Sequence, residues 1–118
     1  MGRYSHRGRM KIYIQEHSFL ARIAAFFLKE KTMALTLGKT IYLWQAECDD
    51  FLQNEKWVRH EMAHVQQFHR NGYIFFILAY CWETLLHGYT KNKFEVAARL
   101  LENETMDLNK YTFICHKQ

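Results

Sequence analysis

The chain has 118 residues, of which 49% are hydrophobic and 16% aromatic, and its formal net charge is +4. This length supports one hydrophobic core, and the apolar content excludes a disordered protein. We therefore expect a single domain over residues 1–118. Residues 1–10 are predicted to form a flexible basic tail, a solvated terminus rather than an arm for phosphate or anionic lipid.

The cysteines and the apolar runs bear on the cellular location of the protein. Cys48, Cys81 and Cys115 are odd in number and form no CxxC pair, so we expect neither a disulfide framework nor a thiolate zinc site. No signal peptide is apparent, and the most apolar run, residues 73–82, is shorter than the ~20 residues of a membrane span. The sequence predicts a cytoplasmic protein without a membrane span, in which that run is a buried helix or meets a partner. The oligomeric state stays open.

The first half of the chain predicts strands around one helix. Residues 11–16 alternate apolar and polar side chains, as a half-buried strand does. The apolar spacing from Phe19 to Leu28 predicts an amphipathic helix, which His17 or Ser18 can cap. Two β-prone runs, residues 33–37 and 40–44, flank Gly38-Lys39, a pair typical of a hairpin turn. We expect a small antiparallel sheet.

The second half predicts three helices. The first covers residues 50–70, with Asp49 or Asp50 as its N-cap and Asn71-Gly72 at its end. The second runs to about His87 and Gly88, and Asn92 can cap the third. The residues after Asp107 give no clear pattern. The tryptophans are interpreted as core residues: Trp44, Trp57 and Trp82.

The segment RHEMAHVQQFH, residues 59–69, contains the HExxH pattern of zinc-dependent hydrolases. Positions four apart project from one face of a helix, so His60 and His64 can reach one divalent ion, and Glu61 lies beside them. A metal lowers the pKa of a bound water from about 15.7 to roughly 7, and an adjacent carboxylate can accept its proton. The pattern therefore predicts zinc, preferred over manganese, iron or cobalt by ligand type, with Glu61 as general base.

A catalytic zinc site needs a third protein ligand. We prefer Glu95, because an antiparallel return of the last helix would bring its first turn near the HExxH helix. Four other residues remain candidates: Glu83, His87, Glu102 and Glu104.

With these motifs in place, the chain resembles the zincin metallopeptidases of the glutamate-ligand type, the gluzincins. More closely it resembles short bacterial proteins of uncharacterised function that share three segments: ALTLGKTIYL, RHEMAHVQQF and HGYTKNKFEVAA. In that group the last segment commonly reads Asn-Pro-Phe-Glu with a second glutamate and an alanine after it. Here Lys93 replaces the proline and Ala97 the second glutamate, so a ligand at position 97 would be lost.

The resemblance covers residues 33–104 and implies an α+β fold, a minimal zincin-like domain. A small antiparallel sheet would pack on the HExxH helix and two to three further helices, with residues 40–44 as an edge strand that accepts a peptide. His60, His64 and Glu95 would hold zinc, and Glu61 would act as general base in peptide hydrolysis. Gln67 or Asn92 would orient the histidines, and Tyr89 and Tyr42 are available as hydrogen-bond donors.

Two other functions compete with a zinc metallopeptidase. The first is a non-catalytic metal-binding or interaction protein on a zincin scaffold, because a small chain has few residues to form the walls of a substrate cleft. The second, nucleic-acid binding through the basic tail, is not expected, since the predicted helices carry no basic stripe.

Overall fold

The computed structural model describes residues 9–117, so most of the predicted basic tail lies outside the described residues. Within this range the fold is α+β, with five helices and a four-stranded sheet. In chain order the elements are β1 (Met10–Gln15), α2 (Phe19–Leu28), β2 (Met33–Leu37), β3 (Thr40–Trp44), α3 (Cys48–Gln53), α4 (Glu55–Asn71), α5 (Tyr73–His87), α6 (Lys93–Leu101), a 3-10 turn (Leu108–Lys110) and β4 (Tyr111–His116).

The sheet is mixed, with the strand order β2-β3-β1-β4. Only the β2–β3 hairpin is antiparallel, whereas β1 pairs in parallel with both β3 and β4. The prediction of an antiparallel sheet is therefore correct for the hairpin and wrong for the other two pairs. Parallel neighbours are joined by long crossovers, and these leave no local signal in the sequence.

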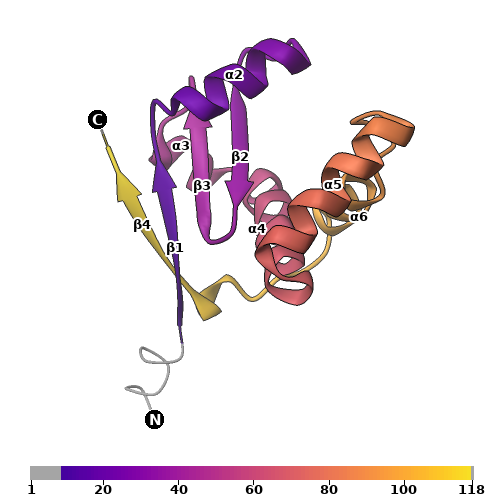
Figure 1. Ribbon diagram of the computed structural model, residues 1–118. Coiled ribbons are helices and arrows are strands. Elements are labelled where there is room, and N and C mark those ends of the chain that lie inside the picture. Colours follow the sequence, from indigo (N-terminus) through magenta and orange to yellow (C-terminus); the bar gives the residue numbers. More distant parts are fainter. Residues whose placement is uncertain (1–8, 118) are drawn as a thin grey trace.

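The edge strands of the sheet are β2 and β4, and β3 lies between β2 and β1. The prediction that residues 40–44 form the free edge is wrong, because β1 pairs with β3 along the side that β2 leaves open. Figure 1 shows α5 and α6 beyond the β2 edge, where they extend the molecule away from the sheet.

The main core lies between one face of the sheet and the helices α3 and α4. Alternating residues of β1 and β3 point into it, which is the pattern that predicts a half-buried strand. Its buried members are Ile12, Ile14, Ile41, Leu43, Cys48, Phe51, Val58, Met62 and Val65. The other face is covered by α2, through Ala21 and Ala25 against Met33.

One predicted helix is two helices in the structure. Asn54 separates α3 from α4 and caps α4, since its side-chain oxygen accepts a hydrogen bond of 3.2 Å from the backbone N–H of Trp57. Asparagine is a strong N-cap and competes with helix continuation, so the expected cap at Asp49 or Asp50 is wrong. The other predicted boundaries are confirmed: Ser18 caps α2, Gly72 ends α4 with φ 88°, and Gly88 ends α5.

Helix α5 is much more exposed than its sequence predicts. Phe76 is its one buried residue, and Trp82 is 60% exposed. The interpretation of this run as a buried helix, and of Trp82 as core, is therefore wrong, whereas Trp44 and Trp57 do pack against the two cores. No helix within residues 9–117 is long and apolar enough to cross a membrane.

A disulfide joins Cys48 at the start of α3 to Cys115 on β4, with 6.2 Å between their Cα atoms. The prediction of no disulfide is wrong, because an odd count allows one pair and one free thiol, here the exposed Cys81. The pairing depends on β4 lying beside β1, which the sequence pattern did not indicate. The cysteines therefore no longer support the prediction of a cytoplasmic protein.

Candidate metal centre

Helix α4 carries the HExxH residues on the side that faces α6 and β2. His60 and His64 are one turn apart, and their ring centroids lie 5.0 Å from each other. His64 and Glu61 are buried and His60 is nearly so. Because the helix is regular between its caps at Asn54 and Gly72, the spacing of the sequence fixes this arrangement.

Glu95 comes from the first turn of α6 and is buried between the two histidines and α5. Its position depends on Asn92, which is fully buried at the N-cap of α6. The Asn92 side chain accepts from the backbone N–H of Phe94 at 2.8 Å and donates to the carbonyl of Tyr80 at 3.1 Å. The predicted cap is confirmed, but Asn92 orients Glu95 through α6 rather than contacting a histidine.

His60, His64 and Glu95 converge on one point. The Nε2 atoms of His60 and His64 lie 2.9 Å and 3.2 Å from the two carboxylate oxygens of Glu95. One ligand atom from each residue lies within 4.8 Å of the others, so the group could hold a metal ion. Tetrahedral ligands at 2.0–2.1 Å from zinc are separated by about 3.3 Å, so the residues fit zinc with small movements.

Both histidines are oriented by an acceptor at their other ring nitrogen. The Nδ1 atom of His60 lies 2.8 Å from a carboxylate oxygen of Glu102, and that of His64 lies 2.9 Å from the amide oxygen of Gln67. Each Nδ1 therefore donates a proton, and Nε2 is the ring nitrogen that each histidine could offer to a metal ion. The role predicted for Gln67 matches this contact, and Glu102 is an orienting partner rather than a ligand. Arg59 fixes Glu102 by donating to its backbone carbonyl at 2.7 Å.

Several ionisable side chains lie close together around His60, His64 and Glu95, and their pKa values are shifted as a result. Burial opposes the charged form of His64, but Glu95 and Glu61 outweigh this effect and raise its pKa to about 9. Burial would raise the pKa of Glu95, whereas its hydrogen bonds with His60 and His64 lower that pKa well below the usual range. Without a metal, the proton therefore stays on His64 at neutral pH, and the ionised carboxylate of Glu95 forms an ion pair with it.

Glu61 lies beside His64 but is held by the sheet. Its carboxylate accepts a hydrogen bond of 2.8 Å from the hydroxyl of Thr36 on β2. Thr36 pairs with Ile41, a core residue, so both side chains point to the α4 face of the sheet. Burial raises the pKa of Glu61, which makes the carboxylate a stronger base than an exposed one.

Tyr80 is a site residue that sequence reasoning missed. Its hydroxyl donates to Glu95, and burial raises its pKa, so the hydroxyl stays protonated. The sequence signal that could have indicated Tyr80 is its spacing of four residues from Phe76. That spacing puts both side chains on the inner face of α5. Of the two predicted tyrosines, Tyr89 lines the same cavity and Tyr42 lines a different one beside the hairpin.

The remaining ligand candidates take no part in the His60, His64 and Glu95 group. Glu83 accepts from the backbone N–H of Lys93 at 3.1 Å, and His87 and Glu104 are exposed. Ala97 is exposed as well, two residues beyond Glu95 on α6. Position 97 thus points away from the histidines, and the carboxylate at position 95 is the one that α6 supplies.

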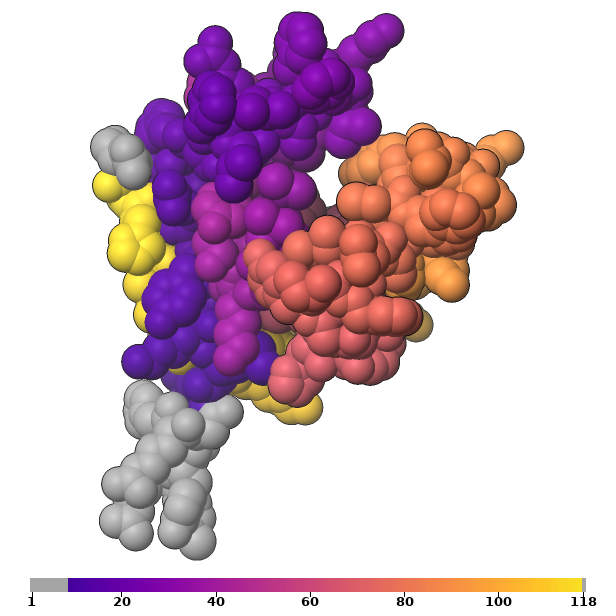
Figure 2. Space-filling model, in the orientation of Figure 1, coloured from indigo at the N-terminus to yellow at the C-terminus, as the bar shows by residue number. Residues whose placement is uncertain are grey.

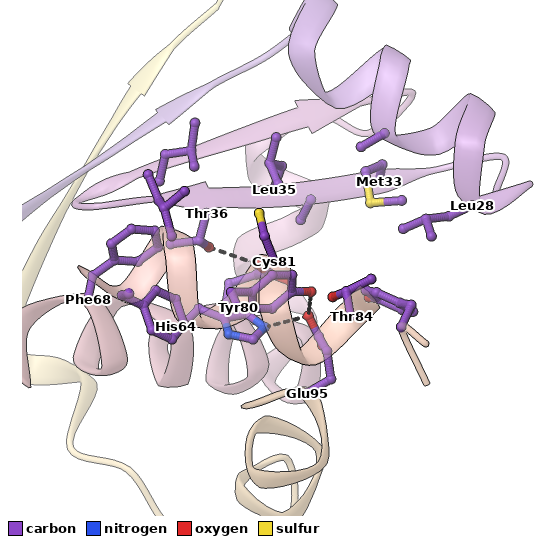
Figure 3. Close-up of a pocket in the computed structure, with 17 residues that line it drawn as sticks. Leu28, Met33, Leu35, Thr36, His64, Phe68, Tyr80, Cys81, Thr84 and Glu95 are labelled. Carbon is purple, nitrogen blue, oxygen red and sulfur yellow. Dashed lines mark hydrogen bonds and ion pairs between the residues drawn. The ribbon is translucent and has the colours of Figure 1, made fainter. Parts of the chain in front are cut away.

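A cavity of about 340 Å³ opens beside this group, between α2 and β2 on one side and α5 on the other. Figure 2 shows the surface hollowed between α2 and α5. Figure 3 shows His64, Tyr80 and Glu95 together at one side of this cavity, with Thr36 on the strand opposite. All five residues of β2 line the cavity, together with apolar side chains such as Leu28 and Ile77.

The site thus joins a buried group that could hold a metal ion to a mostly apolar cleft. Comparisons of the chain with protein families, with curated proteins and with solved structures give no match.

Proposed function

We propose that this protein is a zinc-dependent hydrolase that cleaves peptide bonds. The observation that carries the proposal is the position of Glu61, a buried carboxylate beside His64, at the wall of a cleft that also contains Glu95. His60, His64 and Glu95 would hold the metal through two Nε2 atoms and a carboxylate. This donor set leaves a fourth coordination position open, as catalytic zinc sites do.

A bound zinc ion would supply Lewis acidity, which lowers the pKa of water and polarises a carbonyl group. Glu61 accepts the proton of the attacking water as its oxygen adds to the carbonyl carbon. Glu61 then delivers that proton to the amine nitrogen as the C–N bond breaks. Tyr89, whose pKa is raised by burial, stays protonated in the cleft and can donate to the carbonyl oxygen as negative charge develops.

The free edge of β2 supports an extended peptide as the substrate. Successive side chains of a strand point to opposite faces, so five consecutive residues can line one cavity only if the backbone edge itself faces it. Unpaired N–H and C=O groups of such an edge can pair with an added strand. The volume of about 340 Å³ lies within the roughly 300–1,000 Å³ of small-ligand pockets and has room for an apolar side chain.

The experiment that tests the proposal is hydrolysis of a defined mixture of quenched fluorescent peptides by the zinc-loaded protein, with products identified by mass spectrometry. We expect cleavage beside apolar residues. The Glu61→Gln variant should keep its zinc and lose activity by about 10²- to 10⁴-fold, as removal of a general base does. The matched control is Glu104→Gln, an exposed glutamate, which should keep full activity.

The alternative is a metal-binding or interaction protein without catalysis. It predicts that zinc binds and that neither the parent protein nor Glu61→Gln cleaves any peptide in the mixture. Cleavage that survives Glu61→Gln unchanged would also contradict the proposed role of Glu61.

A further inference from the structure

Two helices border the mouth of the cleft, and both expose large apolar side chains. On α2 the inner face packs on the sheet through Ala21 and Ala25, while the outer face leaves Phe26 78% exposed and Phe27 74% exposed. Exposed aromatic residues on a helix that already has a packed face have no role in the core.

Helix α5 repeats this pattern on the opposite side of the cleft. Phe76 packs inward against Phe68 and Phe94, whereas Leu85 is 79% exposed and Ile74, Leu78 and Trp82 are exposed as well. The exposed residues at positions 74, 78, 82 and 85 recur at helical spacing, so they form one stripe.

The exposed stripes continue from the walls of the cleft. Ala24 lines the cleft and Phe27 is three residues further along α2, and Cys81 lines it and Leu85 is four residues further along α5. Residues at these spacings are neighbours on a helix surface. Phe26 packs against Phe27, with 5.6 Å between their ring centroids. The cleft therefore opens onto an apolar surface on both sides, which we call the apolar rim: Phe26, Phe27, Leu78, Trp82 and Leu85.

Basic residues flank the rim. Arg22 lies on α2, Lys29 and Lys31 follow it, and Lys91 and Lys93 follow α5, and all five are exposed. The same two segments, residues 19–32 and 73–93, contain only two acidic residues, Glu30 and Glu83. The carboxylate of Glu83 already accepts a hydrogen bond from the backbone N–H of Lys93.

From this combination we propose that the apolar rim docks on an anionic lipid surface, so that the cleft opens at the membrane interface. Aromatic and aliphatic side chains enter the boundary between headgroups and acyl chains, and lysines beside them meet anionic headgroups. A second copy of the chain would set the basic flanks against each other, so charge favours lipid over self-association. The proposal does not depend on the metal or on hydrolysis.

Vesicle binding by the full chain tests this. The protein is sedimented with vesicles of phosphatidylcholine alone and with vesicles of equal amounts of phosphatidylcholine and phosphatidylglycerol. We expect binding to the mixed vesicles that weakens as salt rises, with a blue shift of the Trp82 fluorescence that Trp82→Phe removes.

Variants assign the binding to the rim. Phe26→Ser and Leu85→Ser should each weaken it by about tenfold, whereas Leu100→Ser, which changes an equally exposed leucine on α6, should not. Lys29→Gln and Lys31→Gln should each cost roughly fivefold, and Lys56→Gln, on an exposed lysine of α4, should have no effect.

Four results would overturn the proposal. The first is no binding to the mixed vesicles at low salt, and the second is equal binding to vesicles of phosphatidylcholine alone. The third is binding that Phe26→Ser and Leu85→Ser leave intact, which is the result expected if the basic N-terminal residues alone bind the vesicles. The fourth is a concentration-dependent dimer that Phe26→Ser dissociates, since a second copy would then cover the rim.

Discussion

At the level of single residues, Thr36 joins the sheet to the carboxylate of Glu61. Its hydroxyl is the donor to the buried Glu61, so Thr36→Val leaves that oxygen without its partner. Leaving a buried acceptor unsatisfied costs about 1–3 kcal/mol, and we expect this loss in the free energy of unfolding measured in urea. Thr105→Val, at an exposed threonine, should change it by less than about 0.5 kcal/mol. Equal effects of the two variants would contradict the role of Thr36.

His64 makes zinc affinity depend on pH. A histidine must be neutral to bind zinc, and in the metal-free protein the pKa of His64 is about 9, so zinc displaces a proton at neutral pH. Burial opposes the charged form of His60, but its hydrogen bond with Glu95 and the nearby charge of Glu61 outweigh this effect and raise its pKa too. The apparent affinity should therefore rise by at least about tenfold per pH unit until the pH approaches the pKa of His64. Competition with a chromophoric chelator, corrected for the chelator's own protonation, measures this slope. An affinity that does not change with pH would show that His64 is not a ligand.

At the level of helices and strands, the junction between α5 and α6 sets the position of Glu95. Asn92 is fully buried and forms hydrogen bonds with both helices. Asn92→Ala should therefore lower the free energy of unfolding by about 1–3 kcal/mol. It should also weaken zinc binding, because Glu95 would be displaced. Asn54→Ala is the matched control, because it removes the cap of α4 at a cost of about 1 kcal/mol without touching α6. Zinc affinity should fall only in the first variant, and unchanged affinity there would refute the positioning role.

The elements also show what the sequence could predict. The helical conformation of the HExxH segment, the caps at Ser18 and Asn92 and the ends at Gly72 and Gly88 all depend on contacts within a few residues, and these predictions are confirmed. The predicted start of the HExxH helix near residue 50 is wrong, because Asn54 begins a new helix. Glu95 was preferred as a ligand, and the structure brings it to the histidines. Tyr80 was missed because a tyrosine on an apolar helix has the same pattern whether it packs or donates to a carboxylate.

At the scale of the whole molecule, contacts between distant segments explain the wrong predictions. Strand β4 pairs with β1 from the other end of the chain, so the parallel pairing has no local signal, although residues 111–114 are aromatic or β-branched and favour a strand. The exposure of α5 has the same origin, because its apolar run predicts burial and no other element within residues 9–117 covers its outer face. The pairing of Cys48 with Cys115 likewise depends on where β4 returns.

The disulfide between Cys48 and Cys115 is expected to stabilise the whole fold. It closes a loop with a sequence separation of 67 residues, which in a chain-entropy account contributes about 4 kcal/mol. Replacing Cys48 and Cys115 by alanine should lower the free energy of unfolding by about that amount, while any zinc binding persists, since neither residue belongs to the His60, His64 and Glu95 group. Cys81→Ser, at the exposed free thiol, should have little effect. Equal stability of the parent and the double variant would show that the disulfide does not form.

We propose that His60, His64 and Glu95 hold one zinc ion beside Glu61, and elemental analysis of the reconstituted protein measures this without an activity assay. We predict stoichiometric zinc in the parent protein and in Glu61→Gln, and none in His64→Ala or Glu95→Ala, with circular dichroism to verify that each variant is folded. Absence of zinc from the parent protein after reconstitution, or retention of stoichiometric zinc by Glu95→Ala, would contradict the claim.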